Sequence, residues 1–444
     1  MPKAGASKRG ERISQCMIVK NEEKNIERAL SWGKTVMWEQ IVVDTGSTDR
    51  TVEIARGLGA RVVTFPWIDD FSAAKNYAIE QCGGDWIALL DADEYMMPED
   101  AEKLPEFIKE MNARGLDGLS TGWQQLDEEG KIFSSGTQVR IFRNLPDIRY
   151  RRRIHEQLES VEGRELRLGD AVEQLSIFHT GYQGQALAEK KRSGRNRKLI
   201  LEELNNNPED HEMLGYMGDE CFNDGDWEEA ARWYGSAVEH MPRTLREEDQ
   251  RSAATFTNLL MVLTKEEALR DKAGEVYRKA AGLLPQEADF DYVMGRYYAS
   301  MEQADRAAAH LETAVEKLNT YGCSNKALHM AANLLEVYDL LARCCFEAGQ
   351  SEKCMTYAVT CLKYDRYNMA VLSRLLKVLL PGGGQNSLQE NQAVLEFFSR
   401  LYDFSALKDR LFLVKAAQMS GCGGFAEFGA SKLFTQEERG QLRV

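Results

Sequence analysis

The sequence predicts an α/β domain of the Rossmann type followed by an all-α repeat region, and three observations lead to that prediction. Short apolar runs alternate with helical patterns from Ile13 to Asp93. Small and aromatic residues recur at fixed offsets in the second half of the chain. The length of 444 residues is enough for about three domains that each bury a hydrophobic core.

Strands and helices alternate in the first part, an order typical of a parallel sheet with crossover helices. We expect strands in ISQCMIV, IVVDTGS, RVVTF and DWIALLDAD, and helices in NEEKNIERALSW, TDRTVEIARGLGA and FSAAKNYAIEQC. Thr48 and Asp49 are expected to cap the second helix, and Ser72 to begin the third. Residues 118–182 are mixed, with strand-like pieces TQVRIFRN and EQLSIFHTGY.

The second half of the chain contains a repeat. In its first copy, positions 8, 20, 24, 27 and 32 hold Gly218, Ala230, Tyr234, Ala237 and Pro242. The next copy repeats the last four positions with Ala273, Tyr277, Ala280 and Pro285, and a third copy has Gly295, Tyr298, Ala307 and Ala314. This pattern resembles the tetratricopeptide repeat, whose small residues let two antiparallel helices approach closely. The resemblance implies a helical solenoid with a concave surface suited to peptide or protein partners.

Breaks in these patterns suggest the domain limits. PGGGQNS is the clearest break after the repeats. We expect a flexible tail over residues 1–12, an α/β domain over 13–190, repeats over 191–380, a linker over 381–387 and a helical cap over 388–444.

Composition excludes several functional classes. The net charge of −14 argues against general nucleic-acid binding, which needs a basic face. No stretch approaches 18 consecutive apolar residues, and no long apolar block follows the first twelve residues, so we expect neither a membrane span nor a secretory signal. The nine cysteines include no CxxC pair and are expected to be reduced thiols, which indicates a cytoplasmic protein.

Acidic residues follow two of the expected strands. Asp44 ends the strand in VVDTGSTD, at the edge of an open α/β sheet where ligands bind, although it could also serve only to cap the turn. Asp91 and Asp93 follow the apolar run in ALLDADE. Neighbouring carboxylates are costly to bury without a cation, and oxygen ligands favour Mg²⁺ or Mn²⁺, which in turn favour phosphate. The sequence therefore predicts a cation and phosphate site at this edge.

Four ordered motifs make the resemblance specific. CMIVKNEEKNIERAL, IVVDTGSTDRT, DFSAAKNYAI and WIALLDADE together are similar to the family-two glycosyltransferases with a GT-A fold. The later RIFRN, RIHEQL and IFHTGY blocks, followed by the repeats, resemble one branch of that family. The branch includes the peptide S-glycosyltransferases of glycocin biosynthesis and related protein glycosyltransferases.

The resemblance implies roles for individual residues. Asn21, Glu22 and Asp44 match the positions that hold the base and ribose of a nucleotide-sugar, usually a UDP-sugar. Lys75 stands where the family usually has arginine, and a single ammonium lacks the forked geometry of a guanidinium. Of the DxD pair, Asp91 would lie near the ribose and Asp93 would bind the metal. A late histidine often completes the metal coordination in related enzymes, and His179 fits that role unless it is structural.

The family is inverting, so the resemblance implies one displacement assisted by one general base. RIHEQL supplies His155 and Glu156, and we expect Glu156 to be the base because a carboxylate flanked by arginines stays ionised. His155 could serve instead, or Glu156 could only pair with the arginines and order a loop.

These observations combine into one functional hypothesis. We expect a cytoplasmic enzyme that uses Mn²⁺ or Mg²⁺ to move a hexose or N-acetylhexosamine from a UDP-sugar to Ser, Thr or Cys of a peptide or protein held by the repeats. The repeats could also form a homodimer. The alternatives are a glycan or lipid-linked acceptor, or a repeat scaffold whose nucleotide-sugar domain is degenerate.

Overall fold

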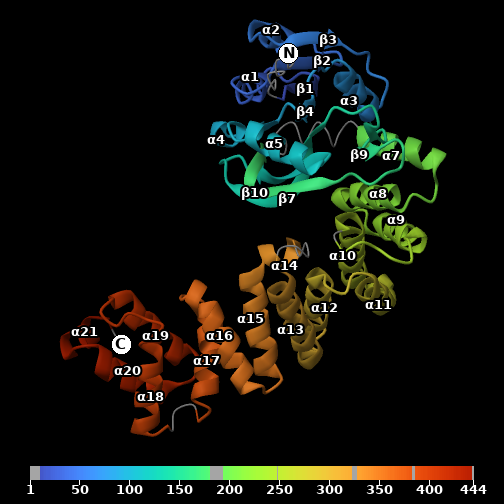
Figure 1. Ribbon diagram of the computed structural model, residues 1–444. Coiled ribbons are helices and arrows are strands. Elements are labelled where there is room, and N and C mark those ends of the chain that lie inside the picture. The colour runs from blue at the N-terminus through green and yellow to red at the C-terminus, as the bar shows by residue number, and fades with distance from the viewer. Residues whose placement is uncertain (1–10, 181–193, 248, 323–327, 383–385, 443–444) are drawn as a thin grey trace, which may run out of the picture. The chain divides into compact units, whose positions relative to one another are not determined.

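The computed structural model describes residues 11–180, 194–247, 249–322, 328–382 and 386–442. The chain divides into two compact units, residues 1–208 and residues 209–444. Residues 1–10 of the predicted tail, the predicted boundary at residue 190 and residues 383–385 of the predicted linker lie outside the described residues. Figure 1 labels the elements of both units.

The first unit alternates strands and helices and then adds a run of strands. Its elements are β1 (Ile13–Val19), α1 (Ile26–Ser31), β2 (Glu39–Asp44), α2 (Thr51–Gly57), β3 (Arg61–Thr64), α3 (Phe71–Glu80), β4 (Trp86–Leu89), β5 (Glu94–Met96), α4 (Pro98–Ala101), α5 (Leu104–Arg114), β6 (Gly118–Leu126), β7 (Ile132–Arg143), β8 (Ile148–Arg151), β9 (Gln157–Ser160), β10 (Leu168–His179) and α7 (Arg195–Asn206).

Eight of these strands form one mixed sheet, in the order β3-β2-β1-β4-β7-β6-β10-β5. The four strands β3, β2, β1 and β4 are parallel, as the alternating pattern predicts. β7 then runs antiparallel to both β4 and β6, and β5 runs antiparallel to β10. The later strands thus extend the sheet beside β4, where the predicted DxD motif begins.

Helices cover both faces of the parallel part of the sheet (Figure 1). Cys16 of β1 packs in a cluster with Ala78 and Ile79 of α3. Its neighbour Met17 points to the other face and packs with residues of α1 and α2. Because successive strand residues alternate between faces, a strand covered on both sides must be apolar throughout, which explains the apolar runs of the sequence.

The second unit is helical. Its elements are α8 (His211–Asp224), α9 (Trp227–His240), α10 (Gln250–Lys265), the 3₁₀ helix η1 (Glu267–Lys272), α11 (Ala273–Leu283), α12 (Ala288–Ser300), α13 (Ala304–Tyr321), α14 (Leu328–Ala332), α15 (Leu334–Glu347), α16 (Ser351–Tyr364), α17 (Met369–Leu379), α18 (Leu388–Phe398), α19 (Leu407–Met419), α20 (Gly423–Leu433) and α21 (Gln436–Leu442).

Two glycines of the repeat pattern allow paired helices to touch. A Cβ added at Gly218 of α8 would lie 2.4 Å from the ring of Tyr234 on α9. A Cβ added at Gly295 of α12 would lie 2.6 Å from Leu311 on α13. Glycine at position 8 therefore faces a large side chain at position 24 in both copies. The structure confirms the predicted helix pairs and, with them, the tetratricopeptide-repeat solenoid.

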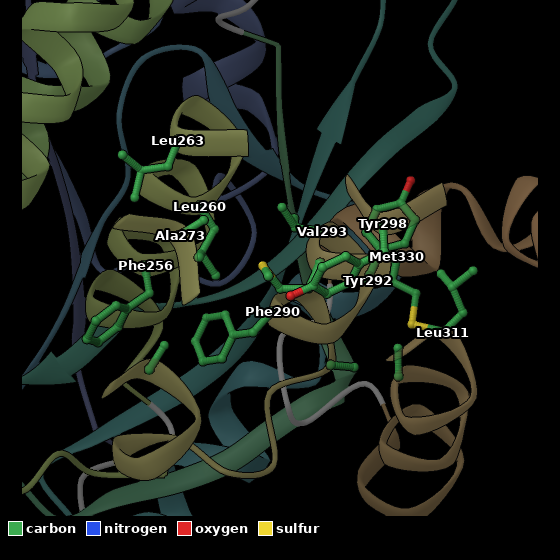
Figure 2. Packing of buried hydrophobic residues seen from close by; sticks show 14 of the residues in the cluster. Phe256, Leu260, Leu263, Ala273, Phe290, Tyr292, Val293, Tyr298, Leu311 and Met330 are labelled. Carbon is green, nitrogen blue, oxygen red and sulfur yellow. The ribbon is translucent and has the colours of Figure 1, made fainter. Parts of the chain in front are cut away.

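Neighbouring pairs share a continuous apolar core. Figure 2 shows Phe256 of α10 facing Phe290 of α12, and the two ring centroids are 5.9 Å apart. The same cluster extends through Leu311 of α13 to Cys344 and Cys345 of α15, both fully buried. The cysteines of the described ranges are free thiols. None of the helices in those ranges has both the length and the apolar character that crossing a lipid bilayer requires.

Candidate functional site

Asp44 ends β2 and organises the turn that follows. Its carboxylate accepts hydrogen bonds from the backbone N–H groups of Ser47 at 3.0 Å and Gly46 at 3.3 Å. Gly46 has φ of +111°, a conformation that favours glycine. The Asp44 side chain is therefore held at the carboxyl end of the parallel sheet, where ligands of open α/β folds bind.

Asn21 lies against the same turn. Asn21 Oδ1 accepts the N–H of Thr48 at 2.8 Å, and the Asn21 N–H donates to Ser47 Oγ at 2.9 Å. Its φ of +57° is one that asparagine tolerates better than most residues. The next residue, Glu22, donates its N–H to Thr51 Oγ1 at 2.7 Å and accepts from Asn25 Nδ2 at 2.8 Å. The structure thus brings the three predicted base and ribose residues together around the turn after β2.

A second group of predicted residues meets beside the end of β4. Lys75 Nζ on α3 lies 2.5 Å from Glu156 Oε1 and 3.2 Å from Asp91 Oδ1. The Lys75 side chain is only 3% exposed, whereas Asp91 is 35% exposed. The other oxygen of Asp91 accepts from Arg140 Nη2 at 3.0 Å. Asp91 therefore lies between two buried cations and remains partly open to solvent.

The ion pairs determine the ionisation of Lys75 and Asp91. Burial opposes ionisation of Asp91, but Lys75 and Arg140 outweigh it and hold the pKa of Asp91 well below its usual range. Burial likewise works against the charge on Lys75, yet Asp91 and Glu156 raise the pKa of that ammonium above its ordinary value. Lys75 and Asp91 are therefore both charged at neutral pH.

Hydrogen bonds tie α3 to the segment that carries Glu156. Asn76 Nδ2 donates to the carbonyl of Tyr150, and the Tyr150 N–H donates back to Asn76 Oδ1, both at 2.8 Å. Ser72 Oγ donates to the carbonyl of Arg152 at 2.5 Å. The prediction that Ser72 begins α3 is wrong. The helix starts at Phe71, and Asp70 caps it by accepting the N–H of Ala73 at 2.8 Å. Because these bonds hold α3 against this segment, Lys75 on the helix can form its ion pair with Glu156.

Asp93 follows β4 in the chain, and its side chain lies beside His179, the last residue of β10. His179 Nε2 lies 3.5 Å from Asp93 Oδ2, and both side chains are mostly buried. Thr180 supports them, because its N–H and its Oγ1 both donate to the carbonyl of Asp93, at 3.0 and 3.1 Å. Arg28 Nη2 in turn donates to Thr180 Oγ1 at 2.7 Å.

This pair fits part of the coordination of Mn²⁺ or Mg²⁺. Such ions are often held by one or two protein ligands, with water and substrate phosphate completing the shell. The carboxylate of Asp93 is a ligand type that suits Mg²⁺ and Mn²⁺. Among the residues that the structure describes, no group of three or more His, Cys, Asp or Glu side chains forms a complete metal cage. Asp93 and His179 would therefore need the phosphates of a ligand to bind the ion firmly.

Sequence reasoning missed the residues that support these groups. Glu94 is 1% exposed and accepts from Arg140 and from Trp123 Nε1. Tyr150 lies against Lys75, whose Nζ is 5.3 Å from the ring centroid. Glu94 is visible in the ALLDADE motif, where a third carboxylate so close to two others needs a cation. The roles of Trp123 and Tyr150 depend on strand pairing and leave no such signal.

Comparisons with known proteins identify a family match in the first unit. Residues 14–167 match the family model described as glycosyl transferase family 2, and the predicted site residues other than His179 lie in that range. A TPR repeat-containing protein from Synechococcus elongatus is 34% identical over 226 residues, which are 50% of this chain and 55% of that protein. The SPbeta prophage-derived glycosyltransferase SunS of Bacillus subtilis is 28% identical over 212 residues, 46% of this chain and 48% of that protein. The chain thus spans about half the length of these two relatives.

A solved structure also shows limited similarity. Glucosyl-3-phosphoglycerate synthase from Mycobacterium tuberculosis, in complex with uridine diphosphate, is 25% identical, and the match covers 26% of this chain and 45% of that chain. Its TM-score of 0.24 is too low to support an argument about this chain. The family match over residues 14–167 and the fold of the sheet instead identify the type of domain in the first unit. The first unit is built on a glycosyl transferase family 2 domain with a GT-A fold, and the chain continues into a tetratricopeptide-repeat solenoid.

Proposed function

We propose that this chain is a metal-dependent, inverting glycosyltransferase that moves a hexose or N-acetylhexosamine from a UDP-sugar to Ser, Thr or Cys of a polypeptide. The observation that supports it best is the convergence of Lys75, Asp91 and Glu156 beside β4, within the segment that matches the glycosyltransferase family. A scaffold with a degenerate donor site would have no need to keep this group of buried charges.

The donor is assigned to the carboxyl edge of the sheet. Asn21, Glu22 and Asp44 bind the base and ribose through the turn after β2, and Asp91 contacts the ribose from the other side. Asp93 and His179 would hold Mn²⁺ or Mg²⁺, which would supply positive charge for the diphosphate. The ion, when bound, neutralises charge that builds on the leaving diphosphate. Lys75 supplies a further positive charge beside Asp91.

Glu156 acts as the general base in this proposal. An inverting transfer needs one carboxylate that accepts the proton of the acceptor hydroxyl or thiol as the acceptor attacks the sugar. The Glu156 side chain is 14% exposed, and its Oε1 lies 2.5 Å from Lys75 Nζ. Helix α3 fixes its position through the Asn76 and Tyr150 hydrogen bonds. His155 is the other candidate for this role.

The repeats are proposed to hold the acceptor. A cavity of 620 Å³ in the second unit is lined by α12, α15 and α17, with Arg296, Arg343, Arg374 and four carboxylates around it. Arg296 and Arg343 are about half exposed and make only long ion pairs, at 3.6 Å with Glu336 and 4.0 Å with Glu347. Loosely paired charges of both signs suit the backbone and charged side chains of a polypeptide better than an apolar lipid.

The free thiols of the described residues suit a cytoplasmic location, where cysteines stay reduced.

Donor use can be tested without knowing the acceptor. The full chain is incubated with individual UDP-sugars and Mn²⁺, and UDP release is measured for the wild type and for Asp93→Ala. We expect slow release with at least one UDP-sugar and its loss in the variant. No release from any UDP-sugar, together with no binding of UDP and Mn²⁺, would favour the scaffold.

The acceptor can be found by comparing cells. Mass spectrometry of proteins from strains with and without this chain should reveal a hexose or N-acetylhexosamine on Ser, Thr or Cys. Arg343→Gln in the cavity should reduce that modification, whereas Arg278→Gln, on the exposed face of α11, should not. Modified glycans or lipids with unmodified proteins would contradict a polypeptide acceptor.

A further inference from the structure

Glu94 is a buried carboxylate with four hydrogen bonds. Its Oε2 accepts from the Asp91 N–H at 3.0 Å and from Arg140 Nε at 2.9 Å. Its Oε1 accepts from Arg140 Nη2 at 2.7 Å and from Trp123 Nε1 at 2.9 Å. With 1% of its side chain exposed, Glu94 has no open surface to offer a ligand. Its contacts are with groups that themselves touch the predicted site.

The first of these connections leads to the predicted ribose carboxylate. Arg140 Nη2 is shared between Glu94 and Asp91 Oδ2, the latter at 3.0 Å. The Asp91 backbone N–H also donates to Glu94 Oε2. Glu94 therefore holds the backbone of Asp91 directly and its side chain through Arg140. A rotation of Asp91 would break its charge-assisted hydrogen bond with Arg140, whose side chain is only 12% exposed, and this is costly.

The second connection leads to the predicted metal ligands. The Trp123 ring, held through its Nε1, stacks on His179 with centroids 4.9 Å apart and planes 30° apart. His179 Nε2 then faces Asp93 Oδ2 at 3.5 Å. The imidazole is therefore oriented by an aromatic face whose own position depends on Glu94.

We propose that Glu94 is a positioning residue that aligns both halves of the donor site, Asp91 through Arg140 and His179 through Trp123. The inference rests on the proposed function, since it assumes that Asp91 faces the nucleoside and His179 the metal. It assigns Glu94 no contact with the donor. Partners behind a metal ligand commonly change metal affinity by 10-fold to 100-fold, which sets the expected size of the effect.

Three variants of the full chain separate the two connections. Trp123→Phe keeps a ring for His179 but removes the N–H, Arg140→Lys keeps a charge but loses the fork, and Glu94→Gln weakens both. Glu110→Gln is the matched control, because Glu110 is an exposed carboxylate on α5 whose partner is Arg114. Isothermal titration calorimetry measures UDP binding in EDTA, then Mn²⁺ binding in the presence of saturating UDP. Thermal unfolding monitors the fold.

The expected pattern has three parts. Trp123→Phe weakens Mn²⁺ binding by about 10-fold and leaves UDP binding in EDTA unchanged. Arg140→Lys weakens UDP binding and leaves the Mn²⁺ affinity of the UDP complex unchanged. Glu94→Gln weakens both, and the control weakens neither. A residue needed only for folding would lower both affinities in proportion to the unfolded fraction.

Other results would contradict either the positioning role of Glu94 or the proposed function. Affinities of Glu94→Gln within two-fold of the control would overturn the positioning role. If that variant does not fold, equal effects of Trp123→Phe and Arg140→Lys on both ligands, or no effect of either, would overturn it as well. A wild-type chain that binds neither UDP nor Mn²⁺ with UDP would instead refute the proposed function.

Discussion

Lys75 Nζ lies 2.5 Å from Glu156 Oε1, and this contact joins α3 to the segment between β8 and β9. The same ammonium is 3.2 Å from Asp91. One buried cation therefore separates the predicted base from a predicted donor ligand. Removing it would leave two carboxylates close together in a poorly solvated place.

Replacing Lys75 by methionine should destabilise the first unit. The loss of one partner from a buried ion pair is expected to cost about 3 kcal/mol, at the low end of the usual range because Asp91 is partly exposed. Urea unfolding of the full chain at pH 7 measures this free energy. Lys75→Arg keeps the charge and should lose less. If the methionine variant unfolds at the wild-type urea concentration, the ion pair contributes little.

The same variant should change the response of the protein to acid. The pKa of Asp91 is lowered in the folded state, so its stabilisation is present above the unfolded pKa of about 3.9 and is lost as the pH falls through the lower folded value. Without Lys75 the folded pKa rises and this contribution shrinks. Unfolding by acid, followed by tryptophan fluorescence, should therefore begin at a higher pH in Lys75→Met than in the wild type.

Replacing Glu156 by glutamine should slow transfer while sparing donor binding. Glutamine can still accept a hydrogen bond from Lys75 but cannot take a proton, and a general base commonly contributes 100-fold or more. We expect kcat for transfer to fall by about 100-fold with UDP affinity within two-fold of the wild type. Unchanged turnover would exclude Glu156 as the base, and a matching loss in His155→Ala alone would assign the role to His155.

The repeat glycines should differ in their response to alanine. Gly218→Ala places a methyl group 2.4 Å from the Tyr234 ring, and such overpacking should cost about 1–3 kcal/mol. Gly235 is also helical but has no atom within 4 Å of an added Cβ, so Gly235→Ala should stabilise α9 by up to about 1 kcal/mol. Thermal unfolding of both variants gives the comparison. Similar shifts would mean that α8 and α9 are not in close contact.

Glu287 should make the second unit less stable at higher pH. Burial, with a contribution from Asp289, raises the pKa of Glu287 to about 7. The folded state therefore holds a proton that the unfolded state loses above about pH 4.3, and stability falls as the pH rises from there to about 7.

Glu287→Gln removes this titration and keeps the acceptor for the Asp289 N–H. We expect it to stabilise the chain by about 3–4 kcal/mol at pH 8 and by about 1 kcal/mol at pH 5, because one pKa unit corresponds to about 1.4 kcal/mol. Urea unfolding at the two pH values measures the difference. An equal effect at both would show that Glu287 has an ordinary pKa.

The sequence predicted the parts of the site that follow apolar strands. Asp44 ends one such run, and Asp91 and Asp93 follow another, so the strand pattern alone places them at one edge of the sheet. The close packing at the glycines of repeat position 8 was also predictable, because a residue at a constant position in each repeat meets the same neighbouring position, here position 24. These predictions depend on short-range patterns, which a single sequence displays.

The remaining features depend on pairings between distant segments. Lys75 meets Glu156 because α3 packs on β8, and Glu94 meets Trp123 because both β5 and β6 pair with β10. No spacing in the sequence encodes these contacts. Ser72 was a plausible start for α3, but Asp70 has the extended backbone of a cap, and the Ser72 hydroxyl is engaged by Arg152.

The position of β5 has a consequence for how the protein is made. β5 follows β4 immediately in the chain, yet it pairs with β10, the last strand of the sheet to be synthesised. A nascent chain emerging from the ribosome can form the Asn21 turn early, but Asp93 gains its partner only once His179 has left the exit tunnel. The contact between Asp93 and His179 is therefore among the last in the sheet to form, after the parallel strands that carry Asp44 have already been synthesised.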